Sequence, residues 1–427
     1  MNFTFPIKDN IQFSTYRKLS IASLLIGFLA TFLAISLKRM TEYYENIFFD
    51  VANKHLIYFL LFPFVGLSVI YFLRLYLFNN NENKGIKEIF ECSNSKSKNL
   101  PSYKIPSHFI NGFLTVIFGG STGIEVSTVV ASATIGSVCQ QKENIFKKYK
   151  VELISAGVAS GIAALFCSPI AGILFAAEVI SKKVTQSFFI ITIPAITISS
   201  GLLFLLNEQP LFALKISIWN SYAIPYFLLL GILAGIHSVY LTKCVLFFKS
   251  LFLKVKTQYT KIIIGTAILS IFLFLFPELY GDGYHAIHSI IFSSKEHLLT
   301  IPFALTLIGI LFLKPIVTSV TLSAGGDGGV FAPSLFMGAF LGLLVAMVLN
   351  TFFNTHLILV NFIIIGMAAT LSASIHAPFT ALFLVCGIIN DYTLFLPMLA
   401  ICLISKYTAK LIYPFTVYSF SPTIPKL

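Results

Sequence analysis

The distribution of apolar residues begins with two long, uniform segments. Residues 19–37 form an uninterrupted apolar run, and residues 56–78 form a second run that is broken only by Pro63 and Arg74. A run of about 20 apolar residues is long enough for a helix to cross a bilayer. We therefore predict two ordinary membrane-spanning helices near the start of the chain.

Beyond these runs the pattern changes. Residues 79–103 are polar and predict a loop or a short half-buried element. The apolar segments that follow are short and are cut by glycine and proline: 110–118, 153–166, 170–177, 362–375 and 379–389. A bilayer tolerates such broken helices only where protein or a water-filled cavity satisfies the freed backbone groups. The pattern therefore favours a transporter or channel over a receptor or an anchor with plain spans.

The chain also repeats itself. Residues 119–127 (GGSTGIEVS) align without gaps with residues 325–333 (GGDGGVFAP). Residues 157–169 (GVASGIAALFCSP) align in the same order with residues 366–378 (GMAATLSASIHAP). Two such pairs, both offset by about two hundred residues, indicate a duplicated half.

The repeat predicts an all-α polytopic membrane protein with two repeats of tilted and broken helices. We expect a single transmembrane domain with two halves: 1–427 for the domain, 19–206 and 222–420 for the halves. Transporters built from such repeats bind their substrate near the bilayer midplane, between the halves. In the alignment His376 falls opposite Cys167, so we expect it to be structural rather than a ligand.

Composition excludes a water-soluble protein. The chain is 57% hydrophobic and 11% charged, with a mean hydropathy of +0.88, whereas soluble domains carry roughly a quarter charged residues. The net charge of +12 does not indicate nucleic acid, because basic residues flank the apolar runs, where they set orientation and meet anionic lipid. We expect a multi-pass protein of the plasma membrane with a cytoplasmic N-terminus. The six cysteines are scattered singly, which predicts packing rather than disulfides or a metal site.

The stretch GGSTGIEVS allows two interpretations. Its first five residues match the G-x-S-x-G elbow of serine hydrolases, with Ser121 as the nucleophile. An elbow needs a strand before it and a histidine and an acid after it, yet residues 111–118 lead into a helix-rich membrane body. We expect Ser121 to be a loop or capping residue and the protein not to be an enzyme; a membrane serine hydrolase remains the alternative from another class.

The second interpretation is an ion site. A glycine-rich turn that opens a helix presents unpaired N–H groups and the positive end of the helix dipole, which favour anions. Two such turns, before Glu125 and at Val330–Phe331, occupy equivalent places in the two halves. They predict an anion site without a full positive charge; the alternative is that the glycines only allow close helix packing.

Glu125 is a carboxylate in a region with almost no charge. An acid in such a setting costs at least a few kcal/mol unless it is paired or hydrated. At a helix N-terminus its carboxylate can compete with an anion, and protonation would release it. A structural carboxylate paired with a lysine is the alternative.

These residues resemble the CLC family of chloride channels and transporters. The chain matches the family's GREGP motif at Gly123 and Glu125, and its GxFxP motif fully in GGVFAP (328–333). Two further segments are similar, SPIAGILFAAEV (168–179) and NDYTLFLPM (390–398), the latter followed by Tyr418 and Ser419. The resemblance covers about residues 80–420.

The resemblance implies roles for particular residues. Glu125 would be the external gating glutamate, and Tyr418 the pore tyrosine whose hydroxyl points at a central anion. The backbone at Gly329, Val330 and Phe331 would bind that anion. The family also implies that the two repeats have inverted topology. It implies chloride or a similar small anion as the transported ion, no cofactor, and a homodimer with one pore per subunit in the lipid bilayer.

The chain departs from the family in two places. In NKGIK (83–87), Lys84 replaces the pore serine of the GSGIP motif and Lys87 replaces its proline. A lysine at the inner site would strengthen anion binding, but we expect Lys84 to turn to the cytoplasm because a buried lysine is costly. Val179 occupies the position of the internal proton-accepting glutamate and cannot relay a proton. Glu178 is adjacent, although neighbouring residues face different directions on a helix.

The loss at Val179 favours passive conduction. We therefore predict a voltage-gated-type chloride channel gated by Glu125. Within the family the alternative is a chloride/proton antiporter that uses another inner proton route. A carrier for another anion, such as fluoride or nitrate, is a further possibility.

Overall fold

The computed structural model describes residues 2–3, 13–78, 80–81, 83–95, 97–216, 218–293 and 299–419. In these residues the regular secondary structure is helical, apart from a parallel pairing of β1 (Asn2–Phe3) with β2 (Lys183–Val184). Across the described ranges, nine helices are long and apolar enough to cross a membrane. The prediction of an all-α polytopic membrane protein is confirmed.

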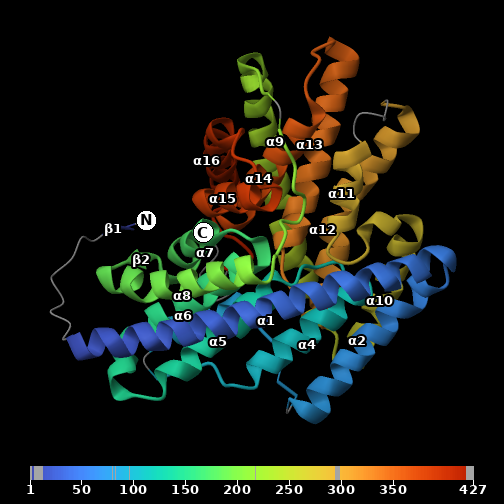
Figure 1. Cartoon of the computed structure of the whole chain (residues 1–427). Helices are drawn as coiled ribbons and strands as arrows, with labels where there is room; N and C mark the ends of the chain where they lie inside the picture. The colour runs from blue at the N-terminus through green and yellow to red at the C-terminus, as the bar shows by residue number, and fades with distance from the viewer. Residues whose placement is uncertain are drawn as a thin grey trace.

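The first half begins with an unusually long helix, α1 (Phe13–Lys54). Its 42 residues span about 63 Å at 1.5 Å per residue, twice the roughly 30 Å core of a bilayer, so it must tilt or project from the membrane. It packs across α4, α5, α6 and α8, as Figure 1 shows. The other helices of this half are α2 (Tyr58–Leu77), α3 (Ile86–Asn94), α4 (Lys104–Ile117), α5 (Glu125–Gln140), α6 (Lys150–Phe166), α7 (Pro169–Phe175) and α8 (Gln186–Leu205).

The second half contains long spans and short broken helices in the same chain order. Its helices are α9 (Ile224–Leu253), α10 (Gln258–Leu275), α11 (Tyr284–Ser293), α12 (Ile301–Ala324), α13 (Phe331–Phe353), α14 (Leu359–Ile375), α15 (Pro378–Ile389) and α16 (Phe395–Ile412). Shorter turns of helix lie at Asn144–Tyr149, Ala176–Ser181, Ser221–Ala223 and Pro277–Leu279.

The two repeats seen in the sequence have the same local structure. Helices α6 and α14 both end at a residue with left-handed backbone, Cys167 (φ 51°) and His376 (φ 57°). A proline then begins the next short helix in each half, at Pro169 and Pro378. The place of His376 at a helix end fits the structural role expected for it. The boundaries of the two halves stay a prediction.

The central helices are buried on nearly all sides. Helices α13 and α14 pack so closely that a Cβ on Gly338 or Gly366 would overlap the carbonyl oxygen of the other glycine. In the first half, Gly136 of α5 meets the carbonyl of Leu153 on α6 in the same way. Small residues at these contacts let the backbones approach, and the packed pairs hold the N-termini of α5 and α13 in the middle of the molecule.

Candidate functional site

The two glycine-rich loops meet in the structure. Gly123 and Gly329 form an antiparallel bridge in which each N–H donates to the other's carbonyl, at 3.5 and 3.3 Å. Helix α5 begins two residues after Gly123, and α13 begins two residues after Gly329. The two helix N-termini therefore converge, as the repeat predicted.

The side chain of Glu125 lies at this junction and is completely buried. Its Oε1 accepts a hydrogen bond of 2.6 Å from the hydroxyl of Tyr284. The backbone amides of Glu125 and Ala332 also face the carboxylate, but Oε2 has no well-formed hydrogen bond within the described ranges. Because Ala332 lies in the first turn of α13, the carboxylate occupies the N-terminus of the opposite helix, where an anion would be attracted.

The alternative that Glu125 is a lysine-paired structural acid is wrong. None of the six ion pairs found among the described residues includes Glu125. The buried acid therefore depends on a tyrosine hydroxyl and on helix amides rather than on a cation.

Tyr418 reaches the start of α13 from the end of the described chain. Its hydroxyl accepts a hydrogen bond of 3.4 Å from the N–H of Val330, and its ring lies 6.4 Å from that of Phe331, centroid to centroid. A Cβ on Gly329 would come within 3.2 Å of the same hydroxyl. The structure thus brings together the residues that the sequence assigned to an anion site.

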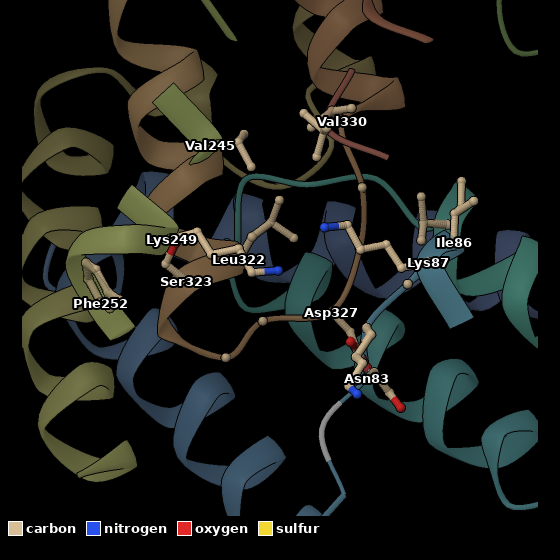
Figure 2. A pocket seen from close by; sticks show the side chains of 18 of the residues that line it. Asn83, Ile86, Lys87, Val245, Lys249, Phe252, Leu322, Ser323, Asp327 and Val330 are labelled. Carbon is tan, nitrogen blue, oxygen red and sulfur yellow. The ribbon is translucent and has the colours of Figure 1, made fainter. Parts of the chain in front are cut away.

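A cavity of about 200 Å³ opens beside Tyr418 (Figure 2). We call it the lysine cavity, because its lining includes Lys84, Lys87, Lys249 and Lys261. Lys87 and Lys249 extend into it from opposite sides (Figure 2), and burial together with the charge of Lys249 lowers the pKa of Lys87. The side chain of Lys84 is exposed. The cavity is therefore a positively charged approach to Tyr418.

Two groups in the wall of the lysine cavity were missed by the sequence analysis. Asp327, in the glycine-rich loop, forms a buried ion pair of 3.3 Å with Arg74 and a hydrogen bond with Asn83. His108 of α4 is buried, and neither ring nitrogen has a hydrogen-bond partner in the described part of the chain. A carboxylate between four glycines, in GGDGG, was a sequence signal that could have marked Asp327 as a site residue. His108 is a lone histidine in an apolar segment, and no sequence signal marked it.

On the other side of Glu125 lies a wider cavity of about 550 Å³. We call it the acid vestibule; its ionisable lining residues are Lys38, Arg39, Glu42, Glu45, Glu208, Asp282, Tyr284, His285 and His288. Glu125 lines a small extension that shares Asp282 and Tyr284 with the vestibule, whereas its neighbour Val126 lines the lysine cavity. The gate candidate therefore stands between the two cavities.

Glu178 is engaged with another helix. Its Oε2 accepts hydrogen bonds from the backbone N–H and the hydroxyl of Thr380, at 2.8 and 2.7 Å. Thr380 lies in the first turn of α15, so the carboxylate satisfies a helix N-terminus. Val179 is buried beside it in a single turn of π-helix.

The structure lacks the geometry that a nucleophile at Ser121 requires. The segment before the loop is helix α4, where an elbow would have a strand. The N–H of Ser121 donates to Thr321 at 3.2 Å, and its buried hydroxyl has no hydrogen-bond partner among the residues described. The interpretation of Ser121 as a loop residue fits this arrangement.

The fold and the site define a class of protein, a multi-pass membrane protein of two inverted repeats whose broken helices meet at a central pore-like junction. The model of the voltage gated chloride channel family matches residues 64–410. The chain therefore belongs to this family, the CLC family.

Similar proteins are exchangers by name. The H(+)/Cl(-) exchange transporter ClcA of Salmonella paratyphi B and that of Salmonella newport are each 29% identical over 332 residues, which is 74% of this chain and 67% of theirs. Among solved structures, a CLC-type fluoride/proton antiporter superposes with a TM-score of 0.80 at 23% identity, covering 96% of this chain and 98% of its own. A slow cyanobacterial Cl-/H+ antiporter reaches 0.77 at 20% identity, covering 96% and 97%.

Proposed function

We propose that this protein exchanges chloride or a similar small anion for protons, and that Glu125 is the gate for both ions. The names of the similar proteins support exchange over the passive channel that the sequence favoured. They also support transport over hydrolysis. The observation that carries the proposal is the position of the Glu125 carboxylate at the N-terminus of α13, beside Tyr284 and near Tyr418.

The mechanism follows because the Glu125 carboxylate and an anion compete for the same position at the N-terminus of α13. Ionised Glu125 occupies the helix N-terminus and excludes an anion. When the carboxyl takes up a proton, its charge is lost and the anion can bind the helix amides instead. Following the family resemblance, we assign the acid vestibule to the external side and the lysine cavity to the cytoplasmic side, where Lys87 and Lys249 attract anions.

An exchanger also needs an inner proton acceptor, and Val179 cannot serve. In this proposal the acceptor is His108, because it is a buried titratable group with unsatisfied nitrogens in the wall of the lysine cavity. The charged groups that face it are Arg74, Glu88, Lys104 and Asp327. Histidine is a common proton carrier in proteins.

The test of exchange uses purified protein in liposomes with an imposed chloride gradient. Protons should move against their own gradient while chloride moves down its gradient. Chloride flux without proton movement would overturn exchange and restore the channel. Adding fluoride or nitrate as competitor would show which anion the site prefers.

The role of His108 is tested by His108→Asn. We expect proton flux to fall at least tenfold while chloride flux persists, since Asn cannot carry a proton. His376→Asn is the matched control, because Asn tolerates left-handed backbone and His376 lies at a helix end. An unchanged ratio of chloride to protons in His108→Asn would remove His108 from the route.

Assembly and location belong to the same proposal. We expect a homodimer in the plasma membrane with one pore in each subunit, supported by the family membership. Cross-linking of the protein in native membranes would measure the assembly, and a cross-linked species no larger than one chain would contradict it.

A further inference from the structure

Glu125 is connected to two buried acids through Tyr284. The hydroxyl of Tyr284 donates to Glu125 at 2.6 Å, and its backbone N–H donates to Oδ1 of Asp282 at 2.9 Å. The N–H of Asp282 donates in turn to Oε1 of Glu45 at 3.1 Å. Three carboxyl groups from α1, α5 and the loop before α11 are therefore linked over a short distance.

A small cavity joins Glu125, Tyr284 and Asp282. It has a volume of about 10 Å³, and its lining includes Glu42, Glu125, Asp282 and Tyr284. A cavity of roughly 10–15 Å³ with polar walls is large enough for one water molecule. Asp282 also lines the open acid vestibule, as Glu42 does, so the carboxyl of Asp282 faces both the bulk solution and the gate.

The charges around Asp282 favour one retained proton. Asp282 and Glu45 are both buried, 4% and 6% exposed. The cation beside them is Lys314, which is fully buried and donates to the carbonyls of Leu279 and Gly281 at 3.4 and 3.3 Å. Two ionised acids beside one lysine would leave a buried negative charge, which is unfavourable.

The environment also acts on Asp282 itself. Burial raises the pKa of Asp282. The hydrogen bond from the N–H of Tyr284 lowers this pKa, and the charge of Glu125 raises it. The other titratable groups that face this cluster are Lys38, Glu42, Glu208, Tyr280 and His285.

We propose that Asp282 and Glu45 form an outer proton relay, which exchanges protons between the acid vestibule and Glu125, and that Tyr284 is a positioning residue that holds the ionised gate. The inference rests on the proposed role of Glu125 as gate.

Each step of the relay balances. The O–H bond of protonated Asp282 breaks, and its proton passes to a water in the small cavity. That water gives another proton to the Glu125 carboxylate, which becomes neutral. Asp282 is then reprotonated from the vestibule, and the reverse sequence releases a proton outward.

The first experiment compares Asp282→Asn with the wild type in liposomes. Asn keeps the acceptor for the Tyr284 N–H but cannot carry a proton, so proton flux should fall at least tenfold while chloride flux persists. Glu208→Gln is the matched control, an acid that lines the vestibule but not the small cavity, and it should keep the wild-type ratio. A wild-type ratio in Asp282→Asn would overturn the relay. If Asp282→Asn does not fold, Glu45→Gln tests the same carboxyl pair.

A second experiment tests the positioning role with Tyr284→Phe. The lost hydrogen bond stabilises the ionised gate, so Glu125 should take up a proton more easily and the external-pH midpoint of chloride flux should move up by about one pH unit. A purely structural role for the hydroxyl would lower flux without moving the midpoint, and that result would overturn the assignment.

Different results would contradict chloride/proton exchange and the outer proton relay. If the wild type moves chloride without protons, exchange is wrong, and the relay is then judged by the external-pH dependence of chloride flux. A midpoint shifted in Asp282→Asn but not in Glu208→Gln would support the relay. A midpoint common to both variants and the wild type would overturn it.

Discussion

At the residue scale, the central feature is a buried acid whose polar neighbours stabilise its ionised form. Ionised Glu125 receives a hydrogen bond from Tyr284 and faces the amides that start α13. Those contacts reduce the cost of a buried charge, which otherwise amounts to several kcal/mol. Protonation removes the charge that they stabilise, so the side chain can leave and an anion can replace it.

The prediction at this scale concerns Glu125→Gln. Glutamine has nearly the same shape but no titratable proton, so chloride flux should lose its dependence on pH and protons should no longer be coupled. Flux of chloride and protons across liposomes at several pH values is the measurement. Glu91→Gln, an exposed acid elsewhere on the chain, is the control, and an unchanged pH dependence in Glu125→Gln would contradict the gate.

At the element scale, function depends on where helices end. Helices α5 and α13 begin at the centre of the molecule, where the glycine-rich loops before them pair through Gly123 and Gly329. Helix α15 starts at Pro378, and Glu178 caps its first turn. A carboxylate at a helix N-terminus stabilises the helix, so we expect Glu178 to have a capping role rather than a place in the proton pathway.

The corresponding prediction is that Glu178→Gln affects stability and not coupling. It removes a charge that accepts two hydrogen bonds from Thr380, so the free energy of unfolding should fall by about 1–2 kcal/mol. Thermal unfolding in detergent and the chloride-to-proton ratio in liposomes measure the two effects. Thr380→Val is the control that removes only the side-chain bond; a changed ratio in Glu178→Gln would assign Glu178 to the proton route.

At the scale of the whole molecule, the two halves together form the candidate anion site. The N-terminus of α5 comes from the first half, while α13 and Tyr418 come from the second. An anion bound at this junction would contact the folded chain only, and a ligand that binds only the native state stabilises it by mass action.

Chloride should therefore raise the Tm of the protein. At 100 times the dissociation constant the stabilisation is about 2.7 kcal/mol. Thermal unfolding in chloride is compared with unfolding in gluconate at equal ionic strength. Tyr418→Ala should reduce the difference, whereas Tyr407→Ala, at a side chain that is 57% exposed, should not. Equal Tm values in the two salts would contradict an anion site at the junction.

The sequence by itself determined the membrane environment, the duplicated half and the meeting of two helix N-termini. These features follow from hydropathy and from local spacing, which can be read within one segment or by comparing its two copies. For the same reason Glu125 and Val330 could be named in advance, whereas Tyr418 came only from the resemblance to the CLC family. The sequence favoured a channel because that inference depended on the absence of one residue, at Val179, without the groups that surround the path, whereas the names of similar proteins favour an exchanger.

Only the tertiary structure decided those surroundings. The bond from Tyr284 to Glu125 joins residues 159 positions apart, and that from Asp282 to Glu45 joins residues 237 positions apart. No local pattern marks such pairs, because Tyr284, Asp282 and Glu45 are ordinary polar residues in their own segments. They become a buried network only when α1, α5 and the loop before α11 pack together and exclude water from their polar groups.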